Sequence, residues 1–307
     1  LRQIEIYLES LRLAEQQKQE IEEMIGVGLL PESELAAAEA EIALRREGLI
    51  NARSSLEKTR ITLLSLLGPP GKGTWTRPVE LLVQPSMPDV PLDEVERHVA
   101  LALKMRPDLS QARLLVQRGE IELVKTGNGL LPRMDFFITL GKTGYADSFR
   151  RSIKELDGGS YDAGAGLRLS MLPVNRQARA EHRRALLSRD QAEEALENLA
   201  RLVQVDVRSA HIEVVRAREQ VAATAATRAL QEEKARIEKE KFRVGKSTSL
   251  LVAQAQRDLL SSRISEVQAV TNYLKSLISL YRLEGSLLER RGIRVNAPGE
   301  ATGLPER

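Results

Sequence analysis

Two stretches of this chain share one length and one apolar pattern, and each begins and ends at a glycine. The first opens at Val27-Gly28-Leu29 and closes at Leu67-Gly68; the second opens at Val244-Gly245-Lys246 and closes at Glu284-Gly285. The two glycines are 40 positions apart in each stretch (28 to 68 and 245 to 285). An α-helix rises about 1.5 Å per residue, so each stretch predicts a rod about 60 Å long that ends at a glycine. A rod built twice indicates a repeat architecture.

Aligned positions of the two stretches hold apolar residues in both. Placing Gly28 on Gly245 without a gap aligns Leu35 with Val252, Ala38 with Ala255, Ile42 with Leu259, Ala52 with Ala269 and Leu63 with Leu280. Steps of three and four residues between apolar positions are those of one helix face. We therefore expect a mainly α fold, made of long antiparallel helical hairpins that pack like coiled coils.

The composition favours long helices over a compact catalytic core. Aromatic residues make up 3% of the chain and charged residues 29%. Helices that pack along a seam use small and aliphatic side chains in this way. The net charge of +3 comes from 46 basic and 43 acidic residues interleaved along the helices, so it does not indicate a nucleic-acid surface. The absence of cysteine excludes disulfides and thiolate metal sites.

Residues that would support catalysis or a bound cofactor are missing or dispersed. The segment from Gly68 to Thr74 lacks the glycine spacing and the hydroxyl of a phosphate-binding loop, and no strand precedes it. His98, His182 and His211 are too scattered to form a recognisable transition-metal site. We expect no catalytic residue, no cofactor and no resident metal, while a metal ion as transported cargo stays open.

Helix-breaking residues divide the chain into four segments. Residues 1–68 predict a helical hairpin that bends between Gly26 and Pro31, and residues 69–106 predict an irregular connector with one short helix. Residues 107–285 hold a helix, two strands and a second long helical hairpin, and residues 286–307 are expected to be disordered. Because Leu1 stands within an amphipathic helix that has no cap, we expect the chain to start inside a longer repeat.

After Pro132 the apolar period changes from helical to two. Polar or small residues alternate first with Met134, Phe136, Ile138 and Leu140, and then with Ala165, Leu167, Leu169 and Met171. Each predicted strand has about ten residues, the length of a tilted membrane strand. The pattern predicts a β-hairpin over about 131–173, with the polar stretch 142–160 as its loop. A lone hairpin leaves backbone groups unpaired, so these strands must join others.

In this order and spacing, several short motifs resemble the outer membrane efflux protein family, the TolC-like channels of Gram-negative bacteria. These motifs are Arg106-Pro107-Asp108-Leu109, Leu130-Leu131-Pro132, Gly166 to Pro173 with Asn175-Arg176, Lys241 to Gly245, and the glycine that closes each rod. The resemblance covers residues 1 to about 288. Residues 107–285 resemble a complete second repeat, and residues 1–68 resemble the last two helices of a first repeat whose N-terminal part this chain lacks.

The resemblance implies a fold, partners and a location. In the family, three protomers each contribute four strands to a twelve-stranded outer-membrane barrel that opens into a helical tunnel. The chain is then expected to belong to an exit duct of a tripartite efflux or type I secretion system, in the outer membrane and periplasm of a Gram-negative bacterium. The expected partners are a periplasmic adaptor protein, an inner-membrane pump, outer-membrane lipid and two further copies in a homotrimer, and no nucleic acid.

The resemblance also assigns an adaptor contact to the two helical tips. The residues concerned are Val27, Gly28 and Leu29 on one tip and Val244, Gly245 and Lys246 on the other. Glycine permits a tight reversal there, and the residues beside it form a small apolar contact at the end of each rod.

Two further assignments concern the inside of the duct. Some family members carry a ring of aspartates where this chain has the uncharged Leu251 and Gln254. Glu32, Glu34 and Glu39 of the first rod are the alternative acids for a tunnel mouth, although acids in the first turn of a helix are usually dipole partners. Arg168 is expected to face the barrel lumen, because a charge facing lipid at mid-membrane would cost about 2–4 kcal/mol.

A second class of function stays open on the residues alone, namely a soluble coiled-coil scaffold or an adaptor hairpin that encloses no pore. The segments 134–140 and 164–172 discriminate between the classes, because a soluble scaffold has no need of membrane-length strands between its rods. The sequence does not identify the transported substrate, whether drug, metal ion or polypeptide.

Overall fold

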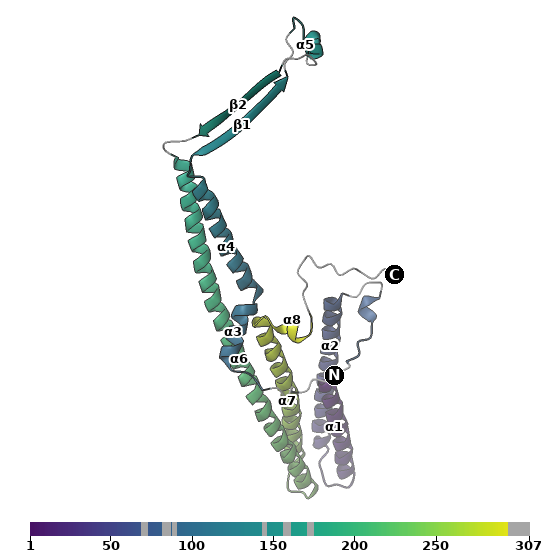
Figure 1. The fold of residues 1–307 in the computed structure, drawn as a ribbon. Coiled ribbons are helices and arrows are strands. Elements are labelled where there is room, and N and C mark those ends of the chain that lie inside the picture. Colours follow the sequence, from purple (N-terminus) through teal and green to yellow (C-terminus); the bar gives the residue numbers. More distant parts are fainter. Residues whose placement is uncertain are drawn as a thin grey trace. The chain divides into compact units, whose positions relative to one another are not determined.

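The structure, a computed structural model, describes residues 1–68, 73–81, 87, 91–142, 146–155, 161–170 and 175–293. The chain divides into two compact units, Leu1–Ala102 with Val205–Arg307, called here the hairpin unit, and Leu103–Gln204, called the strand unit. Helix α6 (Arg176–Arg243) contributes its first part to the strand unit and the remainder to the hairpin unit (Figure 1). Parts of the predicted connector, and residues 294–307 of the predicted disordered tail, lie outside the described residues.

The first helical hairpin consists of α1 (Arg2–Gly26) and α2 (Ser33–Leu67). Its buried seam is aliphatic and comprises Ile6, Ala14, Ile21, Ala38, Ile42, Leu49 and Leu64. Gly48 marks a close approach of the two helices, because a methyl group at this position would overlap the Tyr7 ring. The buried Arg45 donates from Nε to Ser10 Oγ at 3.2 Å and forms an ion pair with Glu41.

The second helical hairpin consists of the C-terminal part of α6 and α7 (Ser249–Leu283). Three ion pairs link the two helices: Arg228 with Glu266 at 2.7 Å, Lys234 with Asp258 at 2.8 Å, and Arg263 with Glu232 at 2.8 Å. On α6 the buried Val207, Val214 and Val221 recur every seven residues, the step of a coiled-coil seam.

The glycines that are 40 residues apart in the sequence each follow the end of a helix. Gly28 (φ +76°) and Gly245 (φ +70°) start the reversals after α1 and α6, and Gly68 (φ +52°) and Gly285 (φ +80°) follow the ends of α2 and α7. Helices α2 and α7 each have 35 residues. The predicted mainly α fold of long antiparallel hairpins is confirmed. None of the described helices has the length and apolarity that a membrane span requires.

In the strand unit, α4 (Pro107–Asn128) packs along the first part of α6. Thr126 Oγ1 lies 3.1 Å from His182 Nδ1. Gly119 brings the helices close, because a methyl group there would lie 3.1 Å from Arg189 Cβ. Small residues and short polar contacts therefore set the spacing of these two helices.

The motif at residues 106–109 fixes the start of α4. Pro107 is the first helical residue, where its missing N–H costs nothing. Arg106 Nη2 lies 2.6 Å from Asp108 Oδ2, and Asp108 Oδ1 accepts from the Leu109 backbone N–H at 2.9 Å. The hydrogen bond from Arg106 lowers the pKa of Asp108, and the same carboxylate satisfies the Leu109 N–H in the first turn of α4.

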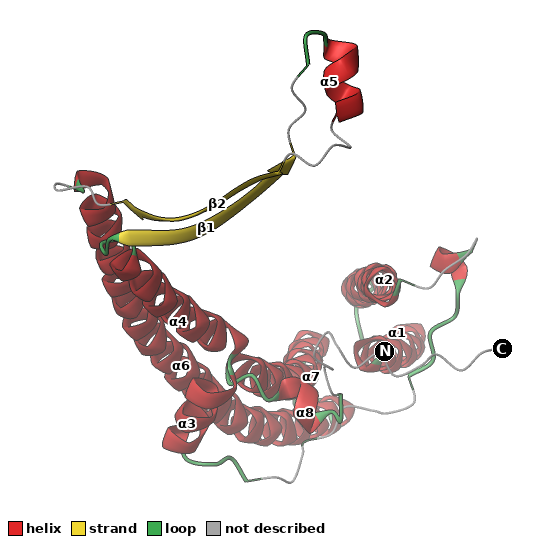
Figure 2. Cartoon of the chain, turned by 45° about the horizontal axis from the view of Figure 1, so that its top comes forward, coloured by secondary structure: helices red, strands yellow, loops and turns green. Residues whose placement is uncertain are grey.

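Strands β1 (Arg133–Lys142) and β2 (Tyr161–Ser170) form an antiparallel ribbon (Figure 2), and this confirms the predicted β-hairpin. Successive residues of a strand point to opposite faces. One face is wholly apolar in its interior, with Met134 opposite Leu169, Phe136 opposite Leu167, Ile138 opposite Ala165 and Leu140 opposite Ala163. The other face carries Asp135, Phe137 and Thr139 opposite Arg168, Gly166 and Gly164. Residues 171–173 of the predicted hairpin lie outside the described residues.

Short helices occur in segments predicted to be irregular. Helix α5 (Phe149–Glu155) interrupts the predicted polar loop, and the 3₁₀ turn η1 (Thr74–Thr76) lies in the connector before α3 (Val95–Met105). Helix α8 (Leu287–Arg290) occupies the start of the tail predicted to be disordered from residue 286, and Ser286 itself is buried. That prediction is wrong for residues 286–290, because the reversal at Gly285 returns the chain onto α7.

Candidate functional site

The two helical tips have the same backbone construction. After α1, Gly28 N donates to Ile25 O at 2.9 Å and Leu29 N donates to Met24 O at 2.8 Å. After α6, Gly245 N donates to Phe242 O at 3.0 Å and Lys246 N donates to Lys241 O at 2.7 Å. Such a pair of bonds around a left-handed residue is the Schellman motif. Its left-handed position favours glycine, so Gly28 and Gly245 terminate their helices at these points.

The side chains at the tips are largely apolar and exposed. Val27 is 72% exposed, Leu29 73% and Val244 67%, and Lys246 is exposed beside them. Burial of apolar area lowers the free energy by about 25 cal/mol per Å². A surface that covers these residues is therefore bound favourably. The adaptor contact predicted for the tips stays a prediction, and its residues have the exposure that it requires.

A shared apolar cluster holds the two tips next to each other within the hairpin unit. The cluster contains Ile21 of α1, Ala38 of α2, Phe242 of α6 and Val252 of α7. Each helical hairpin thus supplies two of the four side chains. The cluster therefore joins the two helical hairpins close to their tips.

The residues predicted for a tunnel mouth have different surroundings. The Glu34 carboxylate accepts a hydrogen bond from the Ser249 hydroxyl and so ties α2 to the start of α7. Leu251 is exposed, and its backbone N–H lies 3.4 Å from the capping oxygen Thr248 Oγ1. Gln254 is exposed on the same helix. Within one chain Glu34 has a structural contact, and the gating role of the three residues stays a prediction.

Arg168 lies on the polar face of the β-hairpin, as the strand period predicts. It is paired with Asp135 in the strand register, and its guanidinium carbon lies 5.4 Å from the centre of the Phe137 ring. This distance is that of a cation–π contact. Leu167 and Leu169, its neighbours in the chain, lie on the apolar face.

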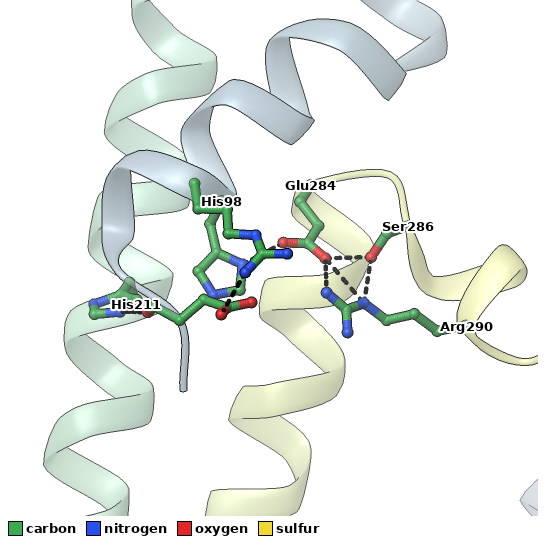
Figure 3. Close-up of polar contacts among 7 residues, drawn as sticks. His98, His211, Glu284, Ser286 and Arg290 are labelled. Carbon is green, nitrogen blue, oxygen red and sulfur yellow. Dashed lines mark hydrogen bonds and ion pairs between the residues drawn. The ribbon is translucent and has the colours of Figure 1, made fainter. Parts of the chain in front are cut away.

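A buried polar cluster joins α3 to the end of α7 (Figure 3). His98 Nδ1 lies 2.5 Å from Glu284 Oε2, and the two residues are 2% and 0% exposed. The other carboxylate oxygen accepts from the Ser286 hydroxyl and from Arg290 Nε at 3.2 Å. The ring centre of His211 lies 5.8 Å from that of His98. A buried carboxylate is tolerated only with such partners, so the cluster fixes α3 and α8 on α7.

Sequence reasoning missed this cluster, although the alignment of the two rods contains one signal for it. Glu284 aligns with Leu67, so the second rod has a carboxylate where the first has an aliphatic residue. Leu67 is 66% exposed, whereas Glu284 is fully buried. Its partner His98 is 186 residues away, and no local pattern connects the two. The described part of the chain contains no group of three His, Asp or Glu side chains placed to hold a metal ion.

Long helical hairpins that carry a membrane-length β-hairpin define a class of outer-membrane channel proteins. The outer membrane protein VceC of Vibrio cholerae matches with a TM-score of 0.74 at 16% identity, over 92% of this chain and 66% of its own. A membrane protein from Pseudomonas aeruginosa matches with 0.76 at 18% identity, over 93% and 64%. The Campylobacter jejuni CmeC outer membrane channel matches with 0.71 at 16% identity, over 93% and 59%. The chain therefore spans 59% to 66% of the length of these proteins.

The family model of outer membrane efflux proteins matches residues 99–286, which is well over half of the chain. This protein belongs to the outer membrane efflux protein family. No curated protein sequence matches it. The family predicted from the motifs is confirmed, and so is the prediction that the chain is not an enzyme.

The buried cluster predicts that Glu284 stabilises the contact between α3 and α7. Replacing Glu284 by Ala removes the shared acceptor of His98 and Arg290 and should lower the free energy of unfolding by about 1–3 kcal/mol, the cost of leaving a buried polar group without a partner. Thermal unfolding gives the stability, and hydrogen exchange locates the loss of protection in α3. The matched control is Glu96→Ala on α3. Glu96 is exposed, and its ion pair with Arg208 at 3.0 Å lies at the surface. Equal effects of the two changes would contradict the role of Glu284.

Proposed function

We propose that this chain is part of the outer-membrane exit duct of an efflux or secretion system. Three copies of the intact protein associate, with their β-hairpins in the outer membrane and their long helices enclosing a tunnel in the periplasm. The duct is a passive conduit, and an inner-membrane pump coupled through a periplasmic adaptor supplies the energy. Membership of the efflux family supports the transport role, and the fold shared with outer-membrane channels supports the tunnel.

The observation that carries the proposal is the amphipathic β-hairpin. The large side chains of its apolar face, between Met134 and Leu140 and at Leu167 and Leu169, are 63% to 83% exposed. A strand of ten residues is about 33 Å long, and a tilt of about 45° makes it cross about 23 Å. The apolar band of an outer-membrane barrel is about 25 Å tall. Lipid matches this face in length and polarity, whereas a soluble scaffold leaves it in water.

The strands also require partners beyond this chain. Among the described residues β1 and β2 pair only with each other, so their outer edges leave backbone groups unpaired. Unpaired groups are costly in lipid, where only closed barrels satisfy every strand. Association of protomers closes the barrel in our proposal. The face with Asp135, Thr139 and Arg168 then lines the aqueous interior.

In the proposed duct, the two tips together contact the adaptor. The apolar cluster beneath them holds the two reversals in a fixed relation, and the Schellman motifs fix their backbone. A preformed surface loses little conformational entropy on binding, which favours affinity.

The adaptor contact predicts a loss of binding without a loss of folding. Replacing Val27 and Val244 by Asp places charges in the contact and should reduce retention of the adaptor at least about tenfold, equivalent to about 1.4 kcal/mol. Because both residues are exposed, the free energy of unfolding should change by less than about 0.5 kcal/mol. Copurification with the adaptor and efflux in cells measure the effect.

The matched control keeps the tips apolar. Val27→Leu with Val244→Leu should retain the adaptor and efflux. Undiminished adaptor binding by the Asp variant would refute the contact, and a large loss of stability in that variant would show that the tips act on folding instead.

Membrane insertion of the hairpin predicts that the two faces tolerate charge differently. Ile138→Lys places a charge on the apolar face and should destabilise the membrane-inserted state by about 2–4 kcal/mol. Thr139→Lys places the same charge one residue away on the polar face and should cost less than about 1 kcal/mol. The folded fraction in lipid vesicles, measured by protease resistance of the intact protein, gives both values. Equal tolerance of the two lysines would argue against insertion.

A further inference from the structure

Helix α5 has a surface that the duct does not explain. Phe149 is 84% exposed and Ile153 54%, and their spacing of four residues places them on one helix face. Arg150, Arg151 and Lys154 are exposed on the rest of the helix. The seven residues of α5 thus combine two exposed apolar side chains with three basic ones and one acidic residue. This combination is typical of helices that lie at a membrane surface.

Helix α5 lies in the sequence between the end of β1 and the start of β2, so it is attached to that end of the β-hairpin. Lys142 and Tyr161 are the last cross-strand pair, and Lys142 Nζ lies 5.8 Å from the centre of the Tyr161 ring. Helix α5 begins seven residues after Lys142 and ends six residues before Tyr161. Short connections on both sides therefore keep it near this pair.

At the same end of the β-hairpin, the residues on the apolar face change from aliphatic to basic and aromatic. The apolar face extends as far as Leu140 and its partner Ala163. The pair Lys142 and Tyr161 lies two residues further along the same face, toward the end of the ribbon. Aromatic side chains with a polar tip, and basic side chains with an apolar stem, favour the boundary between hydrocarbon and headgroups. The cross-strand pair therefore marks the level at which the apolar band ends and the headgroups begin.

We propose that α5, with Lys142 and Tyr161, is an anchor that binds the phosphate-bearing headgroups of anionic lipids. Phe149 and Ile153 insert at the boundary of the acyl chains. Arg150, Arg151 and Lys154 pair with lipid phosphates, which the planar guanidinium groups bind through two parallel hydrogen bonds. The three cations are complementary in charge to the lipid phosphates. The apolar face of the neighbouring β-hairpin places α5 at the membrane in our proposal. The anchor rests on the proposed insertion of the hairpin.

The test separates anchoring from insertion by varying lipid charge. The intact protein is diluted from detergent into vesicles of phosphatidylcholine alone, or of phosphatidylcholine mixed with phosphatidylglycerol, and bound protein is measured by flotation. The hairpin should support binding to both vesicles, whereas the anchor should strengthen binding to the anionic ones. At about 1 M salt, where charges are screened beyond about 3 Å, this preference should disappear.

The variant Arg150→Gln, Arg151→Gln, Lys154→Gln should lose the preference, weakening binding to anionic vesicles on the order of 100-fold while leaving binding to neutral vesicles unchanged. The control Arg12→Gln, Arg53→Gln, Lys58→Gln removes the same residue types from exposed positions of α1 and α2 and should keep the preference. Equal binding of the unaltered chain to both vesicles, or equal losses in the two variants, would overturn the anchor and leave insertion standing. Binding to neither vesicle would overturn insertion and the anchor together.

Discussion

A two-stranded ribbon with one apolar face cannot satisfy its own backbone and side chains, and this constraint governs how the whole chain is used. The strands β1 and β2 leave two edges without partners among the described residues and one face without cover. Water hydrates the edges and disfavours the face, whereas lipid favours the face and disfavours the edges. A closed barrel of several such ribbons in lipid resolves both conflicts. In the proposed duct, the helices bring copies of the chain together and extend the enclosed space.

The helical hairpins owe their stability to narrow seams and a few buried polar groups. Ion pairs along the hairpins, such as Lys234 with Asp258, are exposed and contribute about 0–1 kcal/mol each. More of the stability comes from the aliphatic seams, the shared cluster below the tips, and the buried contacts of Arg45 and Glu284. Paired helices of this kind depend on local contacts along their whole length. Glycines stand where these helices end or approach closely, as at Gly68 and Gly48.

Elements with a local signal were predictable from the sequence, and contacts between distant segments were not. The reversals at Gly28 and Gly245 follow from glycine in a helical pattern, and the strand faces follow from a period of two between Met134 and Leu140. The folded start of the tail was missed, because Ser286 and Arg290 bond to one oxygen of Glu284, whose other oxygen contacts His98, 186 residues away in the sequence. Helix α5 was assigned to a polar loop, since seven residues are too few for a clear helical period. The contact of Glu34 with Ser249 likewise joins separate hairpins.

The alternation of lipid and water along β1 tests the central claim most directly. This chain itself has no cysteine. In an intact protein free of other cysteines, single cysteines introduced from Met134 to Leu140 report their own surroundings when labelled in lipid vesicles with a membrane-impermeant, water-soluble thiol reagent. Membrane insertion predicts a period of two, with slow labelling at 134, 136, 138 and 140 and fast labelling at 135, 137 and 139. Uniformly fast labelling at all seven positions would contradict the account, because the apolar face would then be in water.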